Sequence, residues 1–133
     1  MLRVLNEIKE GVVECSPADS FAVQQIEGII DVPLITQQVE SGSFEWEACM
    51  GLVEAVVGVV QSVQESRRTD ETRYKYGVVR SQMLEAGVSP QTKPKAFSGA
   101  LEFLLGRVSA LRIDCANQRW GVIVVVDVVV VVF

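Results

Sequence analysis

Apolar residues recur along most of this chain at steps of three and four, the spacing that places them on one face of a helix. The pattern is clear at the start, where Leu2, Leu5, Ile8 and Val12 follow one another with polar residues between them. We therefore predict an amphipathic helix over residues 2–14.

Capping residues and prolines divide the next part of the chain. Ser16 suits a helix N-cap and Pro17 suits the first helical position, so we predict that a second helix starts there. Pro33 either ends that helix or starts a new turn, because proline inside a helix costs roughly 3 kcal/mol. A short third helix is expected over residues 34–40, closed by Gly42.

The longest apolar run extends from Phe44 to Val63. Twenty residues are too many for a strand, since strands usually have about 3–10. Small and polar residues recur along it and just beyond its end at steps of three and four, and they form one narrow ridge: Glu47, Gly51, Glu54, Gly58, Gln61 and Glu65. A helix that is apolar on nearly every other side is a central helix, and its glycines allow close approach of a neighbour. A membrane span is the alternative, but acidic residues at its middle and flanks argue against it.

Two more helices are expected after this run. A charged turn over residues 67–71 leads into a helix that starts at Thr69 and ends at Gly87, and two prolines mark residues 88–96 as a loop. The last helix carries an unbroken apolar stripe to about residue 117: Phe97, Leu101, Leu104, Val108, Leu111 and Cys115. The sequence thus predicts an all-α fold, a helical bundle fragment of about six helices around a long apolar central one.

The last twelve residues, 122–133, consist of nine valines, one isoleucine, one aspartate and one phenylalanine. Valine favours extended structure, and a helix of this length rises only about 18 Å, too short for a hydrocarbon core of about 30 Å. We divide the chain into a helical region, 1–120, and a valine-rich tail, 121–133, whose structure the sequence leaves open. Our hypothesis is that the tail is translated repeat DNA, such as a retained intron, and the alternative is an authentic edge strand or C-terminal helix.

The amino-acid composition excludes several classes of catalytic and metal-binding function. The chain has 133 residues, of which 49% are hydrophobic and 22% charged, as in a globular protein. It has no histidine, which excludes histidine triads and histidine general bases. Cys15, Cys49 and Cys115 are far apart and lack metal-binding spacing, so we do not expect them to bind a metal. We expect them to be buried thiols that stay reduced in a cytoplasmic protein. No catalytic residue, cofactor or metal is predicted.

Charge is unevenly distributed. Residues 1–66 carry two basic and eleven acidic side chains, whereas residues 67–120 carry ten basic and five acidic ones. This polarity either steers a charged partner or holds the two halves together, and ordinary solvated helix faces are the simpler alternative. The basic half lacks a dense lysine and arginine cluster with interleaved aromatics, so nucleic-acid binding is not expected.

Two segments resemble sequence patterns of a known family. The first matches the pattern Leu-Ile-x-Gln-Gln-x-Glu-x-Gly-x-Phe at Leu34, Ile35, Gln37, Gln38, Glu40, Gly42 and Phe44. The second matches at Asp114, Ala116 and Asn117. In the order and rough spacing of these segments over residues 2–120, the chain resembles the N-terminal part of the T-complex protein 11 family. It departs from the family at residues 66–69, which keep Arg68 but lack the usual proline and aspartate, and family members are several times longer.

The resemblance implies a non-enzymatic, all-helical intracellular protein linked to cyclic-AMP-dependent kinase signalling and to sperm function. We accordingly predict a signalling or scaffold protein that acts by binding partner proteins. The candidate partner surface or motif positions are Gln37, Gln38, Arg67, Arg68, Asp114 and Asn117, and helix capping or interhelix hydrogen bonding is the alternative for them. Asp114 is expected to cap its helix or to pair with Arg112 or Arg119.

Two other functions stay open. The rival is an enzyme fragment that uses the turn at residues 67–71, together with Asp114, to handle a phosphate-bearing substrate. The third possibility is a truncated product without function, whose exposed apolar surface leads to self-association.

Overall fold

The computed structural model describes the backbone of residues 1–132 and the side chains of residues 1–117. Within this part of the chain every regular element is a helix, which confirms the predicted all-α class. The elements are α1 (Leu2–Glu14), α2 (Phe21–Ile29), α3 (Val32–Glu40), α4 (Trp46–Val63), η1 (Ser66–Arg68), α5 (Thr69–Gly87), η2 (Pro90–Thr92) and α6 (Lys93–Val132). Six of these elements are α-helices, and the two single-turn 3-10 helices, η1 and η2, lie in segments expected to be turn and loop.

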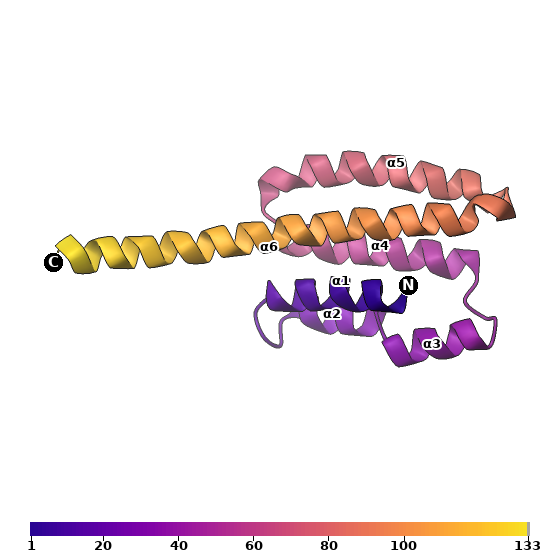
Figure 1. The fold of residues 1–133 in the computed structure, drawn as a ribbon, viewed down its shortest axis with the longest axis horizontal. Coiled ribbons are helices and arrows are strands. Elements are labelled where there is room, and N and C mark those ends of the chain that lie inside the picture. Colours follow the sequence, from indigo (N-terminus) through magenta and orange to yellow (C-terminus); the bar gives the residue numbers. More distant parts are fainter. Residues whose placement is uncertain (133) are drawn as a thin grey trace.

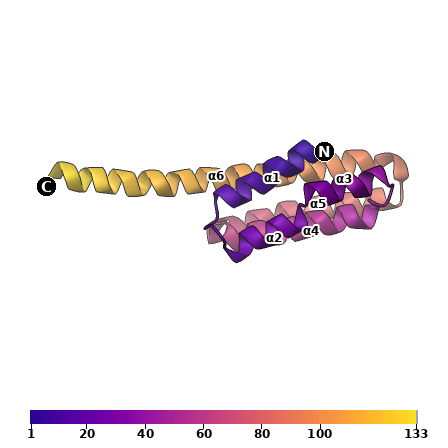
Figure 2. The ribbon, with the colours of Figure 1, turned by 90° about the horizontal axis from the view of Figure 1, so that it is seen from below.

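The helices lie roughly along one direction, as Figures 1 and 2 show. The three longest, α4, α5 and α6, follow one another in an up-and-down arrangement and contact each other. α1 runs parallel to α6 and packs against it, and α2 packs against both α1 and α4. α6 therefore contacts α1, α4 and α5, and joins the N-terminal helices to the rest of the bundle.

The core forms around α4 as predicted. Seven of its residues are buried among α2, α5 and α6: Cys49, Leu52, Val53, Val56, Val57, Val59 and Val60. The ridge residues Glu47, Gly51, Glu54 and Gly58 are exposed on the other side. In the part of the chain with described side chains, no atom comes within 4 Å of a Cβ placed at either glycine, so neither one admits a neighbouring helix.

By length and composition alone, α4 is the one helix in the described part of the chain that is apolar enough to cross a membrane. This is weak grounds for a span, since the core helix of a soluble protein has the same properties, and 39% of the helix is buried inside the bundle.

The predicted apolar stripes of α1 and α6 face each other. Leu5, Ile8 and Val12 of α1 are completely buried, and so is Leu104 of α6. Val108, one turn further along α6, is only 1% exposed. The periodicity therefore identified the buried face of both helices correctly.

Three predicted helix starts are wrong. Residues 16–19 do not begin α2, because Asp19 has φ of 58°, and the cap is instead Ser20, whose hydroxyl accepts a hydrogen bond from the Val23 amide at 3.3 Å. α3 begins at Val32, where the carboxylate of Asp31 accepts from the Leu34 amide at 3.1 Å. α6 begins at Lys93, since the second proline of the expected loop falls in its first turn, where proline is tolerated.

The predicted end of the last helix near Asn117 is also wrong. The backbone of α6 continues as helix to Val132, through the expected boundary at residues 120–121, and extends beyond the bundle (Figures 1 and 2). The extended conformation that valine favours is not adopted, because an existing helix adds each further residue without a new nucleation cost and no neighbouring strand is present in the described chain. The hypothesis about the origin of the tail stays a prediction.

Candidate functional site

Asp114 of α6 lies at the centre of a polar cluster with the turn that precedes α5. Arg68 donates two hydrogen bonds to its carboxylate, from Nε to Oδ2 and from Nη2 to Oδ1, both at 2.9 Å. Arg67 adds a third from Nη2 to Oδ1 at 2.7 Å and also pairs with Glu65. We call Glu65, Arg67, Arg68 and Asp114 the Asp114 cluster. The Asp114 carboxylate is only 2% exposed, and its oxygens are satisfied by charged donors.

These contacts set the protonation state of the cluster. The hydrogen bonds from Arg68 hold the pKa of Asp114 below its ordinary value, against the opposing effect of burial, and the charge of Arg67 adds to the lowering. The same pairing raises the pKa of Arg68. Arg67, Arg68 and Asp114 are therefore charged at neutral pH, and these paired charges fix η1 against α6.

A second group of polar residues extends this contact along α5 and α6. Arg107 of α6 is 8% exposed and donates from Nη1 to Thr72 Oγ1 at 3.2 Å and from Nη2 to Glu71 Oε1 at 3.3 Å. Thr72 in turn donates to Gln64 Oε1 at 2.9 Å, and Lys75 pairs with Glu71 at 2.9 Å. Hydrogen bonds from Lys75 and then the charge of Arg107 lower the pKa of Glu71.

The arrangement is suited to joining helices. Arg67, Arg68 and Arg107 each bind a carboxylate already, so their donors face protein groups. A phosphate would have to compete with Asp114 or Glu71 for the donors of Arg68 and Arg107, which are 21% and 8% exposed, whereas Arg67 is 60% exposed. Both groups of polar residues therefore connect the α4–α5 turn to α6 and have a structural role.

The structure brings together only half of the predicted site residues. Arg67, Arg68 and Asp114 form one cluster, whereas Gln37 and Gln38 lie on α3 and Asn117 is exposed on α6. The backbone oxygen of Gln38 accepts hydrogen bonds from the amides of the α3–α4 turn, which is a capping role. Pairing of Asp114 with Arg112 is wrong, because Arg112 lies 3.4 Å from Glu14, and the side chain of Arg119 lies outside the described residues.

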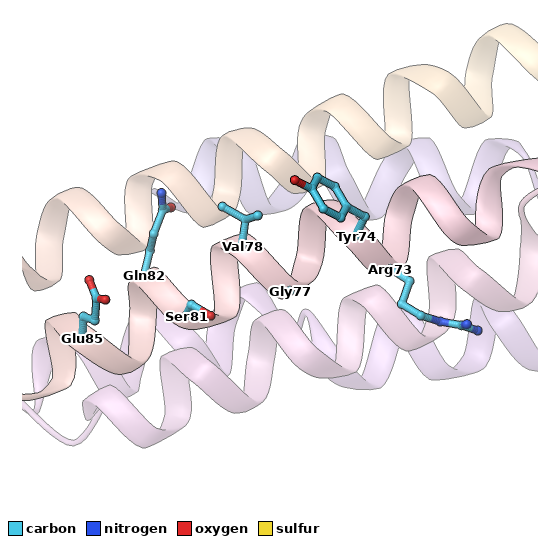
Figure 3. Close-up of a pocket in the computed structure, with 7 residues that line it drawn as sticks. All are labelled: Arg73, Tyr74, Gly77, Val78, Ser81, Gln82 and Glu85. Atoms are coloured by element: carbon cyan, nitrogen blue, oxygen red, sulfur yellow. The ribbon is translucent and has the colours of Figure 1, made fainter.

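The outer face of α5 is the second candidate. Its inward side carries Thr72, Met83 and Ala86, which are buried. On the opposite side Tyr74 is 76% exposed and Val78 is 46% exposed. Figure 3 shows Tyr74, Val78 and Gln82 in one row along α5, with the bare backbone of Gly77 beside them.

A shallow hollow of about 500 Å³ follows this side of α5 and is lined by Arg73, Tyr74, Gly77, Val78, Ser81, Gln82 and Glu85. No described atom comes within 4 Å of a Cβ placed at Gly77. We call Tyr74, Gly77, Val78, Ser81 and Gln82 the α5 face. Sequence reasoning missed it, although the signal was present: Tyr74, Val78 and Gln82 follow at steps of four, opposite the buried stripe.

The expectation of three buried cysteines is wrong for two of them. Cys49 is buried, while Cys15 and Cys115 are partly exposed. Among the described side chains no group of three or more histidine, cysteine, aspartate or glutamate residues is placed to bind a metal.

Comparison of the chain with protein-family models, with curated proteins and with solved structures found no match. The functional proposal therefore starts from the geometry of the α5 face and of the Asp114 cluster.

Proposed function

We propose that this chain is a non-catalytic protein-binding module and that the α5 face is its docking surface. The observation that carries the proposal is a pair of large apolar side chains one turn apart on α5, Tyr74 and Val78, which are exposed on the side opposite the buried core. A helix that only packed in the bundle would present polar residues there. Tyrosine is also enriched among the residues that dominate binding energy at protein interfaces.

The occupant that fits best is an amphipathic helix of a partner protein, lying along α5. Tyr74 and Val78 supply apolar contacts one turn apart, and Gly77 between them lets a partner backbone come close. Ser81 and Gln82 offer hydrogen-bonding groups beside the apolar row. Arg73 and Glu85 flank the row with opposite charges, so a partner helix with an acidic residue near Arg73 and a basic one near Glu85 is favoured.

The cellular role that we propose follows from the sequence resemblance. A T-complex protein 11-like chain would act as a cytoplasmic signalling or scaffold protein, and subunits of cyclic-AMP-dependent kinase are the first partners to look for. The ion pairs of Arg67, Arg68 and Arg107 support protein binding over phosphate chemistry, because each guanidinium is already paired with a carboxylate of Glu65, Asp114 or Glu71.

Site-specific photo-crosslinking in cells tests the docking surface. A photoreactive amino acid at position 78 samples the α5 face, and the same amino acid at position 54 samples the exposed ridge of α4 as a matched control. We expect discrete adducts with another protein from position 78 and none from position 54. The substitution Tyr74→Asp in the same chain should remove the adducts, since it places a charge in the apolar row.

Two outcomes would contradict the proposal. Equal adducts from positions 78 and 54 would mean that α5 has no special role in binding. A nucleotide or phosphorylated metabolite found by mass spectrometry in the purified chain, and lost on Arg67→Ala, would favour the enzyme alternative.

A further inference from the structure

α1 and α6 pack in parallel, and their contact, which we call the α1–α6 seam, is unusually close. At Gly11 the backbone of α1 approaches α6 so closely that an added Cβ would overlap the side chain of Val108. One turn further on, Glu14 pairs with Arg112 at 3.4 Å. The seam then reaches Cys15, whose backbone oxygen lies 3.8 Å from the thiol sulfur of Cys115. Two cysteines that are 100 residues apart in sequence are therefore neighbours in the fold.

The two side chains also contact each other. Burial and then a hydrogen bond with Cys115 raise the pKa of Cys15 to about 12. Burial, and after it the hydrogen bond with Cys115, favour the protonated form of Cys15, as expected for two thiols that share a partly buried site. Cys15 and Cys115 are both partly exposed, whereas Cys49 is enclosed in the core.

We propose that Cys15 and Cys115 are a modification site, a thiol pair that closes to a reversible disulfide by exchange with a low-molecular-weight disulfide. One cysteine thiolate attacks the small disulfide, forms a mixed disulfide and releases one small thiolate. The sulfur of the other cysteine then attacks the mixed disulfide, forms the Cys15–Cys115 bond and releases the second small thiolate. The two protons lost by the cysteines go to the two released thiolates, and the two electrons reduce the small disulfide to two thiols.

Two features of the fold favour the disulfide between Cys15 and Cys115. The close approach at Gly11 and the pair between Glu14 and Arg112 fix the register of α1 on α6, so the two cysteines stay opposite each other. The bond would close a loop of 100 residues, which restricts the unfolded chain strongly. Oxidation therefore fastens the end of α1, and with it the N-terminal helices, to α6.

The experiment uses the full chain, incubated with oxidised glutathione and then treated with a thiol-blocking reagent. We expect peptide mapping without reductant to recover a Cys15–Cys115 linked peptide, with Cys49 blocked as a free thiol. Because the loop is long, the Tm of the oxidised chain should exceed that of the reduced chain by on the order of 10 °C. Dithiothreitol should reverse both changes.

Matched variants separate the pair from the third cysteine. Cys49→Ala should keep the linked peptide and the rise in Tm on oxidation, while Cys15→Ser and Cys115→Ser should each lose both. A short thiol-bridging reagent tests the geometry without oxidation, and it should join Cys15 to Cys115 within one chain. A mixed disulfide with glutathione as the final product, a link through Cys49, or a bond between two chains would overturn the proposal.

Discussion

The substitution Gly11→Ala tests the close packing of α1 on α6. The added Cβ would lie well under 3.0 Å from Cγ1 of Val108, whereas ordinary carbon contacts are roughly 3.5–4.0 Å. Val108 is 1% exposed, and its branched side chain is stiff at χ1, so relief requires α1 to move away from α6. Overpacking costs about 1–3 kcal/mol, and alanine returns roughly 1 kcal/mol of helix propensity. With a clash this severe, we expect a net loss of about 2 kcal/mol in the free energy of unfolding.

Urea unfolding followed by circular dichroism measures this loss, and Gly58→Ala is the matched control. Gly58 also lies inside a helix, but no described atom comes within 4 Å of a Cβ placed there. Alanine at that position should therefore stabilise the chain by about 0.5–1 kcal/mol. The reasoning would be refuted if the two variants had the same midpoint and slope, since α1 would then not lie against α6 as described.

The remaining predictions concern the polar cluster, one helix cap and the α5 face. Asp114→Asn should lower the free energy of unfolding by roughly 1.5–3 kcal/mol in urea, because Arg67 and Arg68 lose their counter-charge and one of the two acceptor oxygens is replaced by an amide donor. The pKa of Asp114 is lower in the folded chain than in the unfolded chain, where an aspartate has a pKa of about 3.9. The stabilisation by Asp114 is therefore complete above about pH 5 and is lost as the pH falls through the folded pKa. Acid titrations of stability should accordingly fall less steeply in Asp114→Asn than in the wild type. Ser20→Ala should lower the free energy of unfolding by about 1 kcal/mol, because it removes the N-cap of α2. Thr36→Ala removes no cap and should lower it distinctly less, and thermal unfolding measures both changes. Val78→Asp should change stability by less than about 0.5 kcal/mol, because the side chain is on the surface, and a larger loss would show that this face is packed.

Local periodicity was enough to find most of the fold. The stripes of α1 and α4 and the start of α5 at Thr69 follow from residues within a few positions of each other, and the structure confirms them. Starts of helices were harder to predict, since they depend on backbone conformation. Ser16 and Pro17 look like a helix start, yet the left-handed conformation of Asp19 moves the start to Phe21.

Contacts between distant residues were beyond reach of the sequence. Asp114 lies 46 positions from Arg68, and Arg107 lies 35 from Thr72, so no spacing rule connects either pair. The neighbouring positions of Cys15 and Cys115 depend on how α1 packs against α6. The resemblance singled out Arg68 and Asp114 as motif positions, and the enzyme alternative grouped Asp114 with the turn at residues 67–71, but the direct hydrogen bonds between Arg68 and Asp114 are seen only in the structure.

The affinity of the crosslinked partner for this chain is the measurement that tests the docking surface most directly. Titration of the purified partner by calorimetry should give a Kd at least about tenfold weaker for Val78→Asp than for the wild type, since a charge would be buried in the interface. The variant Arg67→Ala should bind as the wild type does. Unchanged binding by Val78→Asp together with loss of binding by Arg67→Ala would place the docking surface at the Asp114 cluster and contradict the role of the α5 face.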